Sequence, residues 1–274
     1  MRLSAEVRSC ARALIAERLG LDFPEQRDDD LERRFLRAYQ AADSADPGRY
    51  VAVLAKLPGD SPEWKDFVGH FTVGETYFFR DRGCFEALED VLAPLVERRR
   101  REGSRRLRIW SAGCSSGEEP YSVAMLLDRL LPDRADWSIT ILATDLNPQT
   151  LSAARRGVYR EWSLRETPDQ LRRRYFATRG AGTFELDSDI RRMVTFAPLN
   201  LADGAYPSLA TNTSAMDLIL CRNVIMYFTR AAQRETVARL QELEPAVSVS
   251  GRVDVGEGVL VDGRPAAPGW QHFS

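Results

Sequence analysis

The chain has few of the residues on which several common kinds of active site depend. Among its 274 residues there are two histidines, His70 and His272, which makes a histidine-based metal site or catalytic triad a poor expectation. The four cysteines are scattered without metal or redox spacing, so we expect a reduced, cytoplasmic protein. No apolar run approaches the ~18–20 residues of a membrane span, and no signal peptide is recognisable before the first predicted helix.

Lysine is also scarce, since only Lys56 and Lys65 occur against 38 basic residues in total. The densest arginine run, at 98–101 with further arginines to 108, lies at the predicted end of a helix and in the following loop. Cations are favourable at a helix C-terminus, so we interpret the run as a solvated helix end and expect no nucleic-acid partner. A hydrophobic content of 44% and a charged content of 28% are ordinary for a globular protein. We expect no direct membrane insertion and a monomer.

The most informative segment is 107–121, L-R-I-W-S-A-G-C-S-S-G-E-E-P-Y. It predicts a strand and a turn of small residues, and 122–131 has the apolar spacing of a helix. This is the first unit of a doubly wound sheet, in which ligands bind at the carboxyl ends of strands. Gly113 and Gly117 allow the backbone to approach a ligand closely. Because the loop has no phosphate-binding motif and the acidic pair 118–119 repels phosphates, we expect a ligand such as S-adenosylmethionine.

A second acidic residue supports this expectation. The β-branched segment 137–144 predicts a strand that ends in Asp145, where such folds bind the hydroxyls of a ribose. The alternative is that Asp145 only caps the next helix. Asn147 is a good N-cap before Pro148, which leaves Asp145 available for a ligand.

The order of predicted elements divides the chain in two. Helical patterns at 3–20, 31–42, 47–56 and 62–71, with no strand pattern before Leu107, predict an all-α domain over 1–85. Alternating helices and strands predict a Rossmann-like, doubly wound α/β domain that binds the cofactor over 86–274. Short alternating runs at 183–186 and 193–196 predict a small antiparallel β insertion at about 176–197. Towards the end of the chain, 251–257 is the candidate for the next core strand, and 265–274 is expected to be irregular.

Six motifs together resemble the CheR-type methyltransferases, which methylate glutamates of bacterial chemoreceptors. They are G-L-D-F-P at 20–24, T-V-G-E-T-Y-F-F-R-D at 72–81, W-S-A-G-C-S-S-G-E-E-P-Y-S at 110–122, A-T-D-L-N at 143–147, N-L at 200–201 and C-R-N-V-I-M-Y-F at 221–228. They follow the order of the family from about residue 19 to residue 228. The resemblance implies S-adenosylmethionine as cofactor, S-adenosylhomocysteine as product and a protein-glutamate O-methyltransferase activity in sensory adaptation.

The resemblance also implies roles for individual residues. Arg80 and Tyr227 are the predicted catalytic residues. The guanidinium of Arg80 can hold a carboxylate of the cofactor or of the acceptor, although an arginine at a solvated helix start is the alternative. Tyr227 matches a tyrosine that faces the acceptor, and a core aromatic residue with a solvated hydroxyl is its alternative. The predicted cofactor-binding residues are Gly74, Thr76, Arg80, Gly113, Glu119, Asp145, Asn200, Leu201, Cys221, Arg222 and Asn223. No metal ligands are predicted.

The implied partner is the acidic, helical cytoplasmic region of a chemoreceptor. Arg33, Arg34 and Arg37 match a basic helix that contacts this region in the family. In some members the β insertion tethers the receptor's C-terminal tail by strand addition. A glutamate acceptor has a pKa near ~4.3 and is ionised at neutral pH, so the reaction requires no general base.

Two features favour other functions. Gly74 stands where many members have asparagine, and the segment after residue 244 lacks the usual glycine-rich turn. Both are compatible with a catalytically weak cofactor-binding domain that acts as a receptor-docking scaffold. A methyltransferase for a small carboxylic acid is a third hypothesis, which the helical domain in front of the cofactor loop disfavours.

Overall fold

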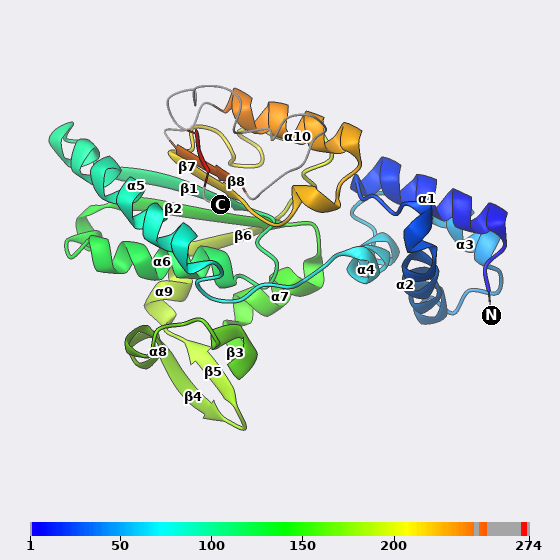
Figure 1. Cartoon of the computed structure of the whole chain (residues 1–274), viewed down its shortest axis with the longest axis horizontal. Coiled ribbons are helices and arrows are strands. Elements are labelled where there is room, and N and C mark those ends of the chain that lie inside the picture. The colour runs from blue at the N-terminus through cyan, green and yellow to red at the C-terminus, as the bar shows by residue number, and fades with distance from the viewer. Residues whose placement is uncertain (1, 244–246, 251–269, 273–274) are drawn as a thin grey trace.

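The computed structural model describes residues 2–243, 247–250 and 270–272. The N-terminal part is all helical, as predicted (Figure 1). Its elements are α1 (Ala5–Leu19), η1 (Glu25–Arg27), α2 (Asp28–Ala41), α3 (Pro47–Leu54) and α4 (Pro62–Phe71). The side chains of Ser4, Asp46 and Ser61 accept hydrogen bonds from backbone N–H groups in the first turns of α1, α3 and α4. Apolar side chains such as Ile15 and Phe35 fill a core between these helices.

The α/β part contains a six-stranded sheet in the order β6-β2-β1-β7-β8-β9, with every pairing parallel. The strands are β1 (Arg106–Ala112), β2 (Ser138–Asp145), β6 (Val194–Pro198), β7 (Leu218–Cys221), β8 (Val247–Ser250) and β9 (Trp270–His272). From β1 the chain moves outward to β2 and β6, and it returns to β7 on the other side of β1. The strand order therefore reverses between β1 and β7, where doubly wound folds form their ligand crevice. The predicted fold class is confirmed.

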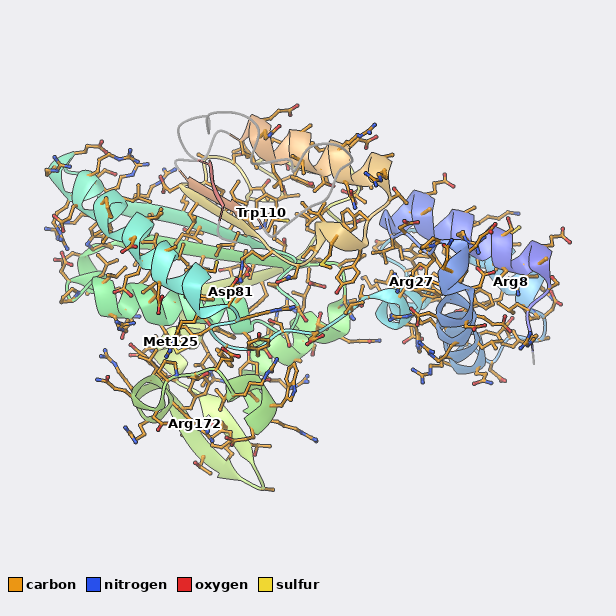
Figure 2. All side chains as sticks on the ribbon, in the orientation of Figure 1. Arg8, Arg27, Asp81, Trp110, Met125 and Arg172 are labelled. Atoms are coloured by element: carbon orange, nitrogen blue, oxygen red, sulfur yellow. The ribbon has the colours of Figure 1, made fainter. Side chains whose placement is uncertain are left out.

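Helices cover both faces of this sheet (Figure 1). The helices of the α/β part are α5 (Arg82–Arg101), α6 (Glu118–Leu130), η2 (Arg134–Asp136), α7 (Pro148–Arg156), α9 (Ser188–Arg192), η4 (Ile225–Tyr227) and α10 (Arg230–Glu242). Alternate strand residues point to opposite faces, so Ile109 packs in the core beneath α5 and α6. Its neighbour Trp110 is fully buried in the other core, which continues into the helical part (Figure 2). The indole of Trp110 donates to the Thr144 hydroxyl over 2.9 Å, which joins β1 to β2.

A second, antiparallel sheet extends from the α/β part in the order β3-β5-β4 (Figure 1). Its lobe comprises β3 (Val158–Arg160), η3 (Glu161–Leu164), α8 (Asp169–Tyr175), β4 (Phe176–Gly180) and β5 (Thr183–Leu186).

The expected extent of the insertion, 176–197, is wrong at both ends. The run at 193–196 becomes β6, which pairs with β2 in the main sheet, and β3 at 158–160 supplies the third strand of the small sheet instead. An alternating pattern identifies a strand, but it carries no information about the strand's partner.

The carboxyl end also differs from expectation. The strand next to β7 is Val247–Ser250, and the candidate strand at 251–257 lies outside the described residues. The segment 265–274 was expected to be irregular, yet Trp270–His272 forms β9. None of the helices in the described ranges combines the length and apolar character that a membrane crossing requires. The domain division at residue 85 stays a prediction.

Candidate functional site

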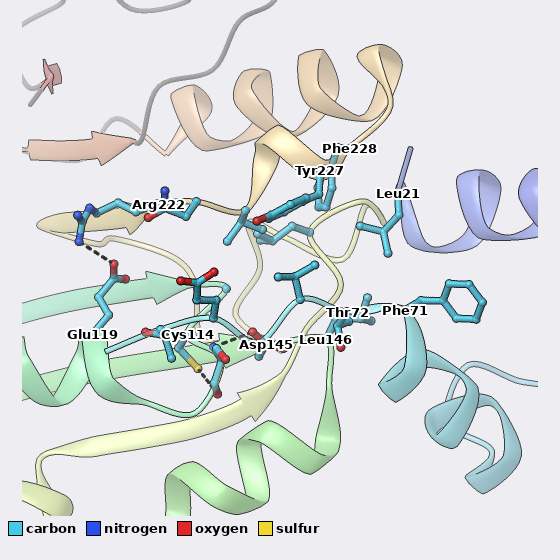
Figure 3. Close-up of a pocket in the computed structure, with 18 of the residues that line it drawn as sticks. Leu21, Phe71, Thr72, Cys114, Glu119, Asp145, Leu146, Arg222, Tyr227 and Phe228 are labelled. Carbon is cyan, nitrogen blue, oxygen red and sulfur yellow. Dashed lines mark hydrogen bonds and ion pairs between the residues drawn. The ribbon is translucent and has the colours of Figure 1, made fainter. Parts of the chain in front are cut away.

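The candidate site is a pocket at the carboxyl ends of β1, β2 and β7, closed on one side by the helical part of the chain (Figure 3). Figure 3 shows Glu119 and Arg222 joined at one end, with Leu21 and Phe71 of the helical part at the other. Ten of the twelve predicted site residues line it: Thr76, Arg80, Gly113, Glu119, Asp145, Asn200, Leu201, Arg222, Asn223 and Tyr227. The sequence motifs therefore converge on one pocket although they are far apart in the chain.

The loop between β1 and α6 forms the floor of this pocket. Gly113 has φ +85°, and its N–H donates to the carbonyl of Thr144 over 2.8 Å. A Cβ at Gly113 would collide with the side chain of Val224, so only glycine lets the loop after β1 pack against the loop after β7. Ser115 has a positive φ of 50°, and its buried hydroxyl has no hydrogen-bond partner among the residues that the structure describes. This buried polar atom in the pocket wall is available to a bound group.

Asp145 lies at the end of β2, as predicted, but its carboxylate already accepts hydrogen bonds from other residues of the chain. One carboxylate oxygen accepts the N–H of Ser115 over 2.8 Å, and the other accepts the N–H of Asn147 over 2.8 Å. Burial raises its pKa, and these two backbone donors oppose the shift. Asn147 caps α7, as predicted. A carboxylate has about four acceptor positions, so Asp145 can hold the loop and still accept hydrogen bonds from a ligand's hydroxyls.

Glu119 and Arg222 form the polar end of the pocket. Glu119 accepts a hydrogen bond from the Ser111 hydroxyl over 2.8 Å and pairs with Arg222 at 3.4 Å. The Arg222 side chain is 7% exposed, and its other terminal nitrogen donates to the carbonyl of Arg80 over 2.9 Å. Arg222 therefore links the loop after β7 to the segment that carries Arg80.

Glu118, which precedes Glu119, is also buried. It accepts hydrogen bonds from the hydroxyls of Ser116 and Ser163, and burial raises its pKa. The bond with Ser163 fastens the small lobe to the cofactor loop. This role was not predicted, because an acidic residue in the first turn of a helix is normally exposed at the surface.

Arg80 lies on a strained stretch of backbone between the two parts of the chain. Phe79 and Asp81 on either side of it have φ values of 55° and 67°, which non-glycine residues rarely adopt. The N–H of Phe79 donates to the buried Ser122 hydroxyl, and the Asp81 side chain caps α5. Such strain persists only where the surroundings impose it. The Arg80 side chain donates to the Glu75 carbonyl over 2.6 Å, and none of the described carboxylates pairs with it.

Tyr227 is held where the helical part meets the α/β part. Its carbonyl accepts the N–H of Asp22 over 2.8 Å, and Leu21 forms a bridge with Phe228. The Asn200 amide donates to the carbonyl of Arg18 over 2.8 Å. The predicted site residues on the α/β part are thus positioned by direct contacts with the helical part.

Two predicted cofactor-binding residues do not line the pocket. Cys221 lies in the core that continues into the helical part, where burial raises its pKa to about 12. Gly74 lies behind the wall: a Cβ there would be 3.6 Å from the Ser115 hydroxyl oxygen and 3.7 Å from a methyl group of Thr150. The lining residues that we did not predict include Asp22, Phe23, Arg27 and Tyr77. Asp22 and Phe23 belong to the motif at 20–24, and Tyr77 belongs to the motif at 72–81. The sequence pattern alone does not indicate that their side chains face the pocket.

The residues present fit S-adenosylmethionine. Gly113 lines the pocket, Asp145 offers acceptor positions for ribose hydroxyls, and the Ser115 hydroxyl has no hydrogen-bond partner in the described part of the chain. The carboxylates of Glu119 and Asp145 suit a ligand with an amine and a sulfonium charge. No group of three or more possible metal ligands occurs among the residues that the structure describes.

Comparison with known proteins agrees with this geometry. Residues 74–264 match the family model of the CheR methyltransferase, SAM binding domain. A probable chemotaxis protein methyltransferase of Rhizobium etli is 34% identical over 218 residues, which cover 78% of each chain. The chemotaxis protein methyltransferase of Escherichia coli is 36% identical over 236 residues, covering 84% of this chain and 77% of that protein. This chain therefore belongs to the CheR methyltransferase family, whose cofactor is S-adenosylmethionine.

Proposed function

We propose that this chain methylates glutamate side chains in the cytoplasmic helical region of a chemoreceptor and so forms glutamyl methyl esters. Membership of the CheR family supports this activity. The observation that carries it is the presence of Arg80 and Tyr227 in the same pocket as Asp145 and Glu119. Cofactor-binding acids and the two candidate catalytic residues thus share one space.

Each wall of the pocket has its own proposed role. Gly113, Asp145 and Glu119 bind the cofactor, with Thr76, Asn200, Leu201, Arg222 and Asn223 completing its surroundings. When bound, S-adenosylmethionine supplies an electrophilic methyl group on a sulfonium. Arg80 orients a carboxylate, because its planar fork matches two carboxylate oxygens and no described acid occupies it. Tyr227 faces the acceptor. Gly74 acts through its backbone beside Ser115.

Orientation is the main contribution that we propose for these residues. A glutamate carboxylate is already ionised at pH 7, given its ordinary pKa of ~4.3. The protein must hold a carboxylate oxygen in line with the methyl group and exclude water. Such orientation can lower a barrier by roughly 7–11 kcal/mol.

Two surfaces are proposed for the receptor. On α2, Arg33 and Arg37 are exposed, whereas Arg34 donates to the carbonyls of His70 and Phe71 and so supports the helical part itself. The small sheet leaves β4 at an edge, where the receptor's tail can add a strand. We also propose that the chain acts in the cytoplasm as a monomer.

The test is transfer of tritiated methyl groups from S-adenosylmethionine to membranes that carry candidate chemoreceptors. The wild-type chain is expected to label a receptor band, and Arg80→Ala is expected to label it far more slowly at saturating cofactor. A folded, cofactor-binding wild-type chain that labels no receptor would support the scaffold instead.

A further inference from the structure

The small lobe lies directly against the segment that carries Arg80. The N–H of Phe78 donates to the Ser163 carbonyl over 2.9 Å, and the Ser163 hydroxyl donates to buried Glu118 over 3.0 Å. These bonds fix η3 beside residues 75–81. A side chain of η3 or of the next residue is therefore held at the rim of the pocket.

Arg165 is the side chain with the most specific placement there. Its guanidinium carbon lies 3.4 Å from the ring centre of Tyr77 and 3.6 Å from that of Trp162. One terminal nitrogen donates to the Trp162 carbonyl over 2.8 Å. Tyr77 lines the pocket, and the Arg80 guanidinium lies 5.6 Å from the same ring. Two arginines thus lie near one aromatic ring of the pocket wall.

The charge of this cluster is not neutralised by its neighbours. Within the described part of the chain neither Arg80 nor Arg165 forms an ion pair. The nearest acid in η3, Glu161, binds Arg172 through both carboxylate oxygens at 2.5 Å (Figure 2 labels Arg172). Glu75 offers Arg80 its carbonyl, and Glu166 is exposed without an ion pair among the described residues. Arg165 therefore keeps free donors that face solvent.

Apolar side chains are exposed in the pocket wall and beside pocket-lining residues. Trp162 is 51% exposed, Val73 in the pocket wall is 41% exposed, and Met226 next to Tyr227 is 55% exposed. A small molecule inside the pocket would leave these side chains in water. A protein docked across the entrance would cover them.

From these observations we infer that Arg165, in contact with the rings of Tyr77 and Trp162, binds a second carboxylate of the receptor segment while a neighbouring glutamate enters the pocket. This inference rests on the proposed function. The contacts with these two rings hold the Arg165 guanidinium in place before binding, so little conformational freedom is lost when the carboxylate arrives. Arg165 would then be a specificity-determining residue that favours glutamates with an acidic neighbour.

The test is steady-state methylation of chemoreceptor-bearing membranes by the full chain, with the receptor concentration varied at saturating cofactor. Arg165→Glu is expected to raise KM for the receptor by about tenfold or more, since like charges oppose docking. The value of kcat and the affinity for S-adenosylhomocysteine are expected to stay within about twofold. Arg98→Glu is the matched control, because Arg98 is an exposed arginine in the last turn of α5, outside the pocket lining, and it should leave KM unchanged.

Several results would overturn the inference. An unchanged KM in Arg165→Glu means that Arg165 does not contact the receptor. A fall in kcat without a change in KM means that it only supports Tyr77 and Arg80. Should Arg165→Glu fail to fold, Arg165→Gln decides by the same KM criterion, with a smaller expected rise of about threefold to tenfold. Absence of receptor labelling by the wild type would instead reject the proposed function.

Discussion

The two walls of the cofactor pocket differ in how their polar groups are paired. In the sheet wall, the loop after β1 is tied to β2: the N–H groups of Gly113 and Cys114 donate to Thr144, and that of Ser115 donates to Asp145. In the wall formed by residues 72–81, Arg80 lies between Phe79 and Asp81, whose φ values are positive, as is that of Ser115 in the sheet wall. The backbone N–H groups of the sheet wall are thus paired within the protein, and the other wall keeps a cation without a described carboxylate partner.

We propose that this difference separates binding from catalysis. A loop whose backbone N–H groups are already paired offers the cofactor a preformed surface, so less conformational entropy of the loop is lost on binding. Arg80 has its position fixed by strained backbone and by Arg222, while its guanidinium stays available. Changes in the sheet wall should therefore affect cofactor affinity and stability, and changes at Arg80 should affect turnover.

The largest expected effect is in the sheet wall. Gly113→Ala adds a left-handed backbone penalty of roughly 1–2 kcal/mol and a clash with Val224 of about 1–3 kcal/mol. Urea unfolding should show a lower free energy of unfolding that includes the backbone penalty and the clash. Calorimetry should show weaker binding of S-adenosylhomocysteine. Gly103→Ala is the control, because Gly103 has φ +70° with nothing within 4 Å and shares only the backbone penalty. Equal losses in the two variants would mean that the close approach of Val224 is unimportant.

Arg80→Lys should lower kcat/KM by roughly 10–100-fold, because a point charge cannot replace the bidentate fork and charged hydrogen bonds contribute about 1.5–3 kcal/mol. Arg80→Ala should be slower still. Initial rates of methyl transfer measure the effect. Arg82→Lys is the control, since its side chain is 75% exposed. Wild-type turnover in Arg80→Lys would make Arg80 a structural residue.

Asp145→Ala should weaken binding of S-adenosylhomocysteine by about 1–3 kcal/mol. It should also lower the free energy of unfolding, because the N–H groups of Ser115 and Asn147 lose their acceptor. Asp187→Ala removes a similar acceptor at the start of α9, away from the pocket, and should lower stability alone. Unchanged affinity in a folded Asp145→Ala variant would contradict the proposed ribose contact.

The smallest expected effect concerns pH. Burial raises the pKa of Glu118 above its value in the unfolded chain, so the unfolding free energy falls as pH rises through the folded-state pKa. Glu118→Gln removes this ionisation and can keep both hydroxyl contacts. It should be more stable than the wild type at pH 8, by at most about 1 kcal/mol, with a smaller difference at pH 5. Urea unfolding at both pH values measures this. Burial also raises the pKa of Asp145, so part of the pH dependence of stability should remain in Glu118→Gln.

The sequence predicted those features that depend on local pattern. Strand, turn and helix at 106–130 follow from apolar periodicity and from glycines that the backbone requires, and the motifs located most of the pocket. Features that depend on long-range pairing were missed. Residues distant in the chain decide which strand pairs with β6 and which core contains Cys221. They also decide that Asp145 accepts the N–H of Ser115 in the loop after β1.

The most direct test of the account is the stability of the labelled product to base. A glutamyl methyl ester is hydrolysed by mild alkali and releases volatile methanol, whereas N-methyl lysine or arginine is not. After transfer of tritiated methyl groups to a chemoreceptor, we predict that alkali which spares amide bonds releases the label as methanol. Label that remains on lysine or arginine after this treatment would contradict glutamate methylation.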